Sequence, residues 1–315
     1  MGDLQGSDTR LLGIRSQCSL IHLIRHKLFH IRPGETINLQ KEGAMKLDEV
    51  SLEAWPMFWA KMTTTEIRHA AQTIKIAMLP VGSIEQHGDH LPVDTDFATI
   101  EYLAERSLIA ARKELKHPVS IIAPGIPYGG PGLGMQEWPG TICLRPEVLI
   151  DAVFDIGKGI TDAGFKCVLV LNGCFGNISP LTLAVQKLKS RIPEGEFILA
   201  DSTWSAYQTI QEVRDSAPGG IGHAGELETS TSLVIDPDHV DMTKAVVGRL
   251  THVSPDVSFD FDGPGPFYWP LAFSQLTQSG VIGDPTVANK EKGEAILEAS
   301  IQGLVDTLTQ VHNLL

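Results

Sequence analysis

The sequence has few cysteines, and they form no pattern. The four in 315 residues show no paired framework and no CxxC spacing: Cys18, Cys143, Cys167 and Cys174. A disulfide-stabilised secreted fold is therefore not indicated. We expect a reducing compartment, and the cytoplasm is the predicted location.

Long apolar runs and an excess of basic residues are also lacking. No apolar run approaches the length of a membrane span, so we expect no membrane partner. Only 25 Lys and Arg residues stand against 38 Asp and Glu residues, which gives a net charge of −13. This negative charge argues against nucleic acid as a partner.

The first 44 residues differ from the rest of the chain. Acidic residues are absent between Asp8 and Glu35, and that stretch holds five basic ones: Arg10, Arg15, Arg25, Lys27 and Arg32. A mitochondrial-type presequence has a similar composition. We interpret residues 1–44 as an N-terminal extension or leader and residues 45–315 as the main folded domain. No internal repeat or low-complexity linker divides the latter.

Short apolar runs alternate with helical patterns along the main folded domain. The runs read as buried strands at residues 74–80, 119–124, 167–171 and 197–201. Helices are expected at residues 46–70, 97–115, 147–163 and 179–188, with a last long helix after residue 283. Strands without polar alternation indicate a mainly parallel central sheet covered on both faces. The predicted fold class is α/β, a three-layer α/β/α sandwich.

The loop after the first strand carries the densest polar cluster. Glu85 and His87 are two residues apart, so in an extended loop both point the same way, and Asp94 and Asp96 repeat the spacing. Carboxylates mixed with imidazole suit Zn²⁺ or Mn²⁺, and a carboxylate can bridge two ions. A solvated, turn-rich loop is the alternative. We favour metal binding, because the cluster follows directly on a buried strand.

Two further stretches could meet this loop. Cys174 follows the third strand at a Gly-flanked turn, where it is a thiolate ligand, a nucleophile or a small buried side chain. His223 precedes Glu226 and Glu228 at an expected helix start. His223 would serve as general acid/base, with one of the glutamates as a metal ligand. A capping cluster is the alternative for the acids, but it leaves His223 unexplained.

Two Gly/Pro-rich segments complete the candidates. The loop at residues 128–134 matches no Walker or Rossmann spacing, so we interpret it as lining or covering the substrate, with Trp138 and Thr141 beyond it. The aromatic segment at residues 259–270 is an oligomer arm, a site cover or plain surface packing.

These residues together resemble the creatininase (creatinine amidohydrolase) family. The resemblance rests on Gly82 to Gly88, His90-Leu91-Pro92, Thr95-Asp96, Trp138 to Thr141, Asn172-Gly173 with Asn177, His223 to Ser230, and Gly280 to Pro285. It covers about residues 50–315.

The resemblance implies an α/β/α sandwich, a homo-oligomer that is often a hexamer, and two ions of Zn²⁺ or Mn²⁺ per chain. Glu85 and Asp96 would hold one ion, His87 and Asp96 the other, with Asp96 as the bridge. His223 falls at the family's proton-transferring histidine. We assign His223 and Glu228 to catalysis and add Cys174 and Glu226 to the metal ligands. The expected substrate contacts are Tyr128, Trp138, Thr141 and Asn177.

Three departures from the family pattern stand out. The third strand normally ends Asn-Gly-His, and here the histidine ligand is Cys174. Thiolate binds Zn²⁺ well and Mn²⁺ poorly. Creatinine-hydrolysing members carry a ligand glutamate where this chain has Gly176, and residues 132–137 are altered too. These changes argue against creatinine itself as the substrate.

The leading hypothesis is a metal-dependent hydrolase that opens a small cyclic amide with a metal-activated water. Three alternatives stay open: a hydrolase of a cyclic ketone from polyol catabolism, which cleaves a C–C bond; a non-catalytic family relative; and a thiol hydrolase with Cys174 as nucleophile and His223 as base.

Overall fold

The structure is a computed structural model that describes residues 56–248 and 269–315. The predicted extension at residues 1–44, the first part of the expected helix at 46–70 and most of the aromatic segment lie outside the described residues. No described helix has the length and apolar character needed to cross a membrane.

Four parallel strands form the sheet, in the order β2-β1-β3-β4. Their bounds are β1 Ile76–Val81, β2 Ser120–Ile122, β3 Cys167–Asn172 and β4 Glu196–Asp201. The register pairs Val81 with Asn172 and Asn172 with Asp201, so the carboxyl ends of β1, β3 and β4 lie level. The predicted strands and their parallel arrangement are confirmed.

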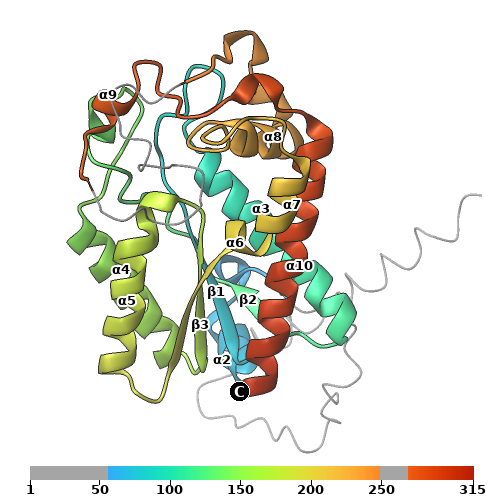
Figure 1. The fold of residues 1–315 in the computed structure, drawn as a ribbon. Coiled ribbons are helices and arrows are strands. Elements are labelled where there is room, and N and C mark those ends of the chain that lie inside the picture. Colours follow the sequence, from blue (N-terminus) through green and yellow to red (C-terminus); the bar gives the residue numbers. More distant parts are fainter. Residues whose placement is uncertain (1–55, 249–268) are drawn as a thin grey trace, which may run out of the picture. The chain divides into compact units, whose positions relative to one another are not determined.

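Helices flank the sheet. Helices α4 and α5 lie on one side of the strands in Figure 1, and α3 and α10 lie on the other. The α-helices are α2 Thr64–Thr73, α3 Thr95–Leu115, α4 Pro146–Asp162, α5 Ile178–Arg191, α6 Ser202–Ser205, α7 Tyr207–Val213, α8 Glu226–Ile235, α9 Phe273–Leu276 and α10 Lys290–Leu314. The 3-10 turns are η3 Trp59–Lys61, η4 Met135–Glu137, η5 Phe175–Asn177, η6 Pro237–His239, η7 Met242–Lys244 and η8 Pro285–Val287.

The main core lies between the sheet and the layer of α3 and α10. Alternate strand residues such as Met78 and Leu169 face this layer and pack with Leu108 and Leu304. All four side chains are almost completely buried. The apolar stripe predicted for α3 therefore faces the sheet as expected.

Of the helix expected at residues 46–70, the described part confirms only residues 64–70. Residues 59–61 form only a 3-10 turn, and α2 begins at Thr64, where a capping box joins Thr63 and Glu66. The apolar residues that suggested a helix face contact other elements. Phe58 forms a parallel bridge with Ile122 beside β2, and the ring of Trp59 lies 5.4 Å from that of Phe165.

Candidate metal centre

Six potential metal ligands converge at the carboxyl ends of β1 and β3. Glu85 and His87 come from the loop after β1, and Asp96 from the first turn of α3. Cys174 directly follows the turn after β3, and His223 and Glu228 lie just before and just inside α8. Four chain segments therefore supply the cluster, and this is the edge where parallel α/β sheets place their sites.

The donor atoms form three overlapping groups, and within each group all atoms lie within 4.8 Å of one another. The first is Glu85, Asp96 and Cys174; the second is His87, Asp96 and Glu228; the third is Glu85, His87 and His223. Asp96 belongs to the first two groups. A carboxylate shared in this way is placed to contact two ions at once.

His87 is held so that one ring nitrogen faces the cluster. Its Nδ1 lies 3.0 Å from the backbone carbonyl oxygen of Glu85, and because a carbonyl only accepts, Nδ1–H donates there. In the neutral ring Nε2 is then bare. It lies 3.3 Å from Oδ1 of Asp96 and 3.5 Å from Oε2 of Glu228. A histidine whose second nitrogen is tied to a carbonyl has the usual arrangement of a metal ligand.

Two buried atoms of the cluster, Nε2 of His87 and Oδ2 of Asp96, make no hydrogen bond. Buried polar atoms are almost always paired, so these two call for a partner. Although burial disfavours a charged ring, the carboxylates of Asp96 and Glu228 raise the pKa of His87 to about 10. The carboxylates thus favour positive charge next to the two unpaired atoms, Nε2 of His87 and Oδ2 of Asp96. The residues fit a divalent cation.

The two glutamates of the cluster are hard to ionise without such a cation. Burial and then Asp96 raise the pKa of Glu85 to about 8, and burial raises the pKa of Glu228 to about 7. Neutral donors hold each carboxylate in place. The hydroxyl of Ser83 donates to Glu85 (2.9 Å), and the backbone N–H of Ala224 donates to Glu228 (2.5 Å).

His223 presents its other ring nitrogen to the cluster. Its Nε2 lies 2.7 Å from the carbonyl oxygen of Gln86, so Nε2–H donates to that oxygen. The bare Nδ1 lies 3.5 Å from Oε1 of Glu85. Burial and the neighbouring His87 hold the pKa of His223 well below its ordinary value, so the ring is neutral. Nδ1 is therefore free to accept a proton or to bind a metal.

Cys174 is a buried thiol in the metal-free site. Its Sγ–H donates to Oε2 of Glu85 across 3.7 Å. Burial, then Asp96, then Glu85 raise its pKa well above the ordinary value. A thiol in such surroundings becomes a thiolate only when a cation replaces the proton.

Two glycines bring Asp96 against the strand ends. A Cβ on Gly173 would lie 2.7 Å from the carbonyl oxygen of Asp96 and 2.8 Å from Cβ of Ile100. A Cβ on Gly82 would lie 2.5 Å from Cα of Phe97. These separations are too short for any side chain, so the first turn of α3 can rest on β1 and β3 only because both positions are glycine.

Comparison with known proteins decides the family. A profile described as Creatininase: Creatinine amidohydrolase matches residues 60–308. The chain belongs to the creatininase family. With its three ligand groups, it is a creatininase-family metal hydrolase.

Its relatives carry three different names. Mycofactocin precursor peptide peptidase of Mycolicibacterium smegmatis is 28% identical over 255 residues, which cover 80% of this chain and 91% of that protein. Creatinine amidohydrolase of Pseudomonas putida is 28% identical over 252 residues, 75% and 89% of the two chains. 3-dehydro-scyllo-inosose hydrolase of Thermotoga maritima is 26% identical over 269 residues, 79% and 81% of the two chains.

Solved creatininase structures share the fold. Creatinine amidohydrolase (creatininase) matches with a TM-score of 0.69 at 24% identity, covering 81% of this chain and 97% of that one. A structure described as Creatininase Mn gives 0.68 at 23%, and a mutant creatininase of the Zn-Zn type gives 0.67 at 25%. Each covers 81% of this chain and 98% of the other. The predicted α/β sandwich is confirmed.

Glu226 does not join the cluster of this creatininase-family site, contrary to its assignment as a ligand. Its carboxylate accepts from the backbone N–H groups of Asp215 (2.8 Å) and Ser216 (2.9 Å) and pairs with Nζ of Lys292. Burial alone would raise the pKa of Glu226, but its hydrogen bonds to Lys292, Ser216 and Asp215 together lower it. Of the two glutamates, Glu228 is the one beside His87.

The four residues expected to contact substrate are engaged elsewhere or lie apart from the cluster's pocket. Asn177 is buried, accepts from Gly130 N–H (2.8 Å) and donates to the Gly82 carbonyl (2.9 Å). Thr141 accepts from the backbone N–H of Gln86. The ring of Trp138 packs edge-on against that of Phe273, 6.4 Å away, and Tyr128 is 40% exposed. Their contact with substrate stays a prediction.

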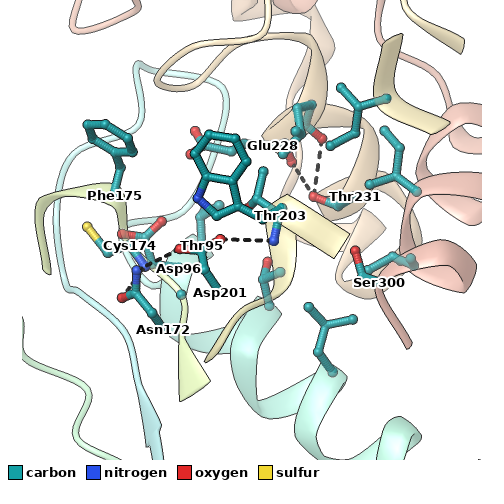
Figure 2. Close-up of a pocket in the computed structure, with 18 residues that line it drawn as sticks. Thr95, Asp96, Asn172, Cys174, Phe175, Asp201, Thr203, Glu228, Thr231 and Ser300 are labelled. Carbon is teal, nitrogen blue, oxygen red and sulfur yellow. Dashed lines mark hydrogen bonds between the residues drawn. The ribbon is translucent and has the colours of Figure 1, made fainter. Parts of the chain in front are cut away.

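The pocket beside the cluster is lined instead by residues of α3, β3, β4, α8 and α10 (Figure 2). Its lining includes Asp96, Cys174 and Glu228 of the cluster, together with Asn172, Asp201 and Thr203. The sequence reasoning missed Asp201. Its position as the last residue of the fourth strand was the available signal, because residues at that end of a parallel strand face the site.

Proposed function

We propose that this creatininase-family protein uses two divalent ions to hydrolyse an amide C–N bond. One ion would be held by Glu85, Asp96 and Cys174, and the other by His87, Asp96 and Glu228. The single observation that carries this proposal is the membership of Asp96 in both donor groups. A lone ion would not need a carboxylate that two ligand sets share.

The donor set favours zinc. Cys174 lies at the position where the family pattern has a histidine, and a sulfur ligand suits Zn²⁺ much better than Mn²⁺. His87 and His223 each direct a bare nitrogen toward the cluster, and imidazole is also a good zinc ligand. Manganese in this chain would have to do without the thiolate.

The ions would supply a water of lowered pKa and an electrophile for the carbonyl oxygen. His223 then moves the proton. Its bare Nδ1 accepts a proton from the attacking water, whose oxygen bonds to the carbonyl carbon. When the C–N bond breaks, Nδ1 returns that proton to the leaving nitrogen, which departs as an amine. The Gln86 carbonyl keeps the ring in one orientation throughout.

An amide is the substrate class that the relatives support best. The proteins from P. putida and M. smegmatis are named as an amidohydrolase and a peptide peptidase, and both names denote cleavage of C–N bonds. The sequence predicts a cyclic amide as the substrate. The name of the M. smegmatis protein adds a peptide as a second kind of amide substrate. The inosose hydrolase of T. maritima favours the C–C alternative, which keeps the same metals.

The thiol alternative has less support. Burial and two carboxylates raise the pKa of Cys174, whereas a nucleophilic cysteine needs a lowered one. A non-catalytic role is opposed by the presence of six donors and of orphan ligand atoms. Assembly as a homo-oligomer, a hexamer by resemblance to the family, stays a prediction, as does the boundary at residue 45.

Elemental mass spectrometry of the purified protein tests the proposal. We expect about two zinc ions per chain in the wild type and about one in Cys174→Ser. Asp96→Asn should lose both, because it removes the shared ligand. Cys143→Ser is the matched control, since Cys143 belongs to no donor group, and it should keep both ions. A wild type without bound metal would overturn the two-ion mechanism.

A further inference from the structure

The pocket beside the metal centre has acidic walls. Its cavity volume is about 60 Å³, and it is partly open to solvent. Three carboxylates line it, those of Asp96, Glu228 and Asp201, and none of its eighteen lining residues is Lys, Arg or His. The other polar side chains along it are neutral: Thr95, Thr99, Asn172, Thr203, Thr231 and Ser300. Nothing in this wall would compensate a negatively charged substrate.

Asp201 is the acid that the metals would not neutralise. It ends β4, and it belongs to none of the donor groups found among the described residues. Two divalent ions carry four positive charges. The carboxylates of Glu85, Asp96 and Glu228 and the thiolate of Cys174 would balance them. The carboxylate of Asp201 then remains as an extra charge in the wall of the pocket.

The partners of Asp201 are all neutral. Asn172 Nδ2 donates to its Oδ2 (3.0 Å) and the backbone N–H of Thr203 donates to its Oδ1 (3.0 Å), as Figure 2 shows. Among the described residues it forms no ion pair. Burial raises its pKa despite these hydrogen bonds. A half-buried carboxylate with neutral partners is stabilised by a cation that arrives from the pocket.

Aromatic rings add to this preference. Phe175 and Trp204 line the same pocket, and their side chains are 59% and 50% exposed. The faces of such rings attract ammonium and guanidinium groups. They also provide apolar surface for the uncharged part of a substrate. The pocket therefore combines an anion, two aromatic rings and the reaction centre.

We infer that Asp201 selects amide substrates that carry a positively charged group, an ammonium group such as the amino terminus of a peptide or an aminoacyl amide. This inference rests on the proposed function, because the scissile amide must lie at the metal centre while the ammonium group reaches Asp201. Asp201 acts in recognition and takes no part in bond breaking.

A binding experiment with hydroxamates tests the role of Asp201 separately from the proposed metal centre. A hydroxamate binds the metals of such a site irrespective of its acyl chain. The charged probes are β-alanine hydroxamate and 4-aminobutyrohydroxamate. The uncharged analogues, with a methyl group in place of the ammonium group, are butyrohydroxamate and valerohydroxamate. Affinities are measured by calorimetry on the zinc-loaded full-length protein. Two chain lengths are used so that one can match the reach to Asp201.

The wild type should bind the better charged probe about tenfold or more tighter than its uncharged analogue, as hydrogen bonds between charged groups allow. Asp201→Asn and Asp201→Ser should abolish this preference and keep both the zinc content and the affinity for the uncharged probes. Serine is included because it can still cap α6. Asp306→Asn removes an exposed charge on α10 and is the control that should keep the preference.

Three results would overturn the inference. The wild type could bind both probes of each pair equally, or the preference could survive in both Asp201 variants. In either case, binding of the uncharged probes would still support the proposed metal centre, so only the inference about Asp201 would fail. If no hydroxamate binds, the proposed metal centre fails, and the inference fails with it.

Discussion

Nε2 of His223 lies 2.7 Å from the carbonyl oxygen of Gln86, and this contact fixes the role of the ring. The nitrogen that carries the hydrogen is committed to the main chain, so only Nδ1 can take part in chemistry. Nδ1 lies 3.5 Å from Oε1 of Glu85 and within the donor group of Glu85 and His87. The proposed proton transfer therefore runs through Nδ1.

His223→Gln should remove this function while keeping the contact with Gln86, because the glutamine amide nitrogen can replace Nε2. We expect kcat to fall by about 10²- to 10⁴-fold, the range for loss of a general acid/base. The rate is measured on whichever amide the wild type hydrolyses. Zinc content should stay at the wild-type value. Loss of an ion instead would show that Nδ1 is a ligand and would contradict the proton-transfer role.

Gly173→Ala should disturb the metal centre by displacing the first turn of α3, which carries Asp96. The new methyl group would lie 2.7 Å from the carbonyl of Asp96, so α3 must shift. We expect the free energy of unfolding to fall by about 1–3 kcal/mol, as for other overpacked sites, and zinc affinity to fall with it. Gly159→Ala is the control. Gly159 lies within α4 with no atom near its would-be Cβ, so alanine should stabilise the helix by about 0.5–1 kcal/mol. Chemical denaturation and zinc calorimetry measure both effects.

The stabilisation that zinc provides should grow with pH. In the metal-free fold the pKa values of Glu85, Glu228 and His87 are raised to about 8, 7 and 10. Their contribution is fully present below the unfolded pKa values of 4.5 for Glu and 6.5 for His, and it is lost as pH rises through the folded values. Zinc replaces the protons and prevents this loss.

Melting temperatures of zinc-loaded and metal-free protein, compared between about pH 5 and about pH 8.5, check this expectation. The difference between the two forms is the useful quantity, because titration far from the cluster affects both equally. A difference that shrinks as pH rises would show that the ions do not occupy this cluster.

Lys292→Met should destabilise the fold strongly. Nζ of Lys292 is buried against Glu226 and also binds Asp215 (2.7 Å), and its removal leaves the Glu226 carboxylate unpaired. Breaking a buried pair costs about 3–5 kcal/mol. In the double variant Lys292→Met, Glu226→Gln, part of the loss should return, because the buried charge is gone. Lys290→Met, at an exposed pair with Glu294, should change the free energy of unfolding by less than about 1 kcal/mol in urea denaturation.

The strands and the clustering of Glu85, His87 and Asp96 could be predicted because their signals are local. The four apolar runs predicted the parallel sheet, and the spacing of Glu85, His87 and Asp96 after the first run predicted metal binding. These residues now lie together at the carboxyl ends of the strands. In the helix expected at residues 46–70, the stretch at residues 56–63 is not helical, for the opposite reason. The contacts of Phe58 with Ile122 and of Trp59 with Phe165 join residues far apart in the chain, and no local pattern encodes them.

The same lack of long-range information explains why the sequence did not separate Glu226 from Glu228 and did not indicate Asp201. Glu226 and Glu228 lie on one helix, and periodicity alone does not tell which of them faces the cluster. The rotation of α8 depends on Lys292, which lies 66 residues beyond Glu226 and binds it. Asp201 is a single acid at the end of a strand. Only the pocket that it shares with Asp96 and Glu228 distinguishes it from a capping residue.

The close packing of α3 against Gly82 and Gly173 affects how the metal ligands of such proteins can change in evolution. Asp96, the proposed shared ligand, is positioned by main-chain contacts that depend on no side chain of the cluster. Cys174 and Glu228 come from separate segments after β3 and in α8. An ancestor could therefore exchange one outer ligand, and with it the preferred element, while the scaffold and the central carboxylate stayed unchanged. Metal preference and architecture would then be inherited as separable traits.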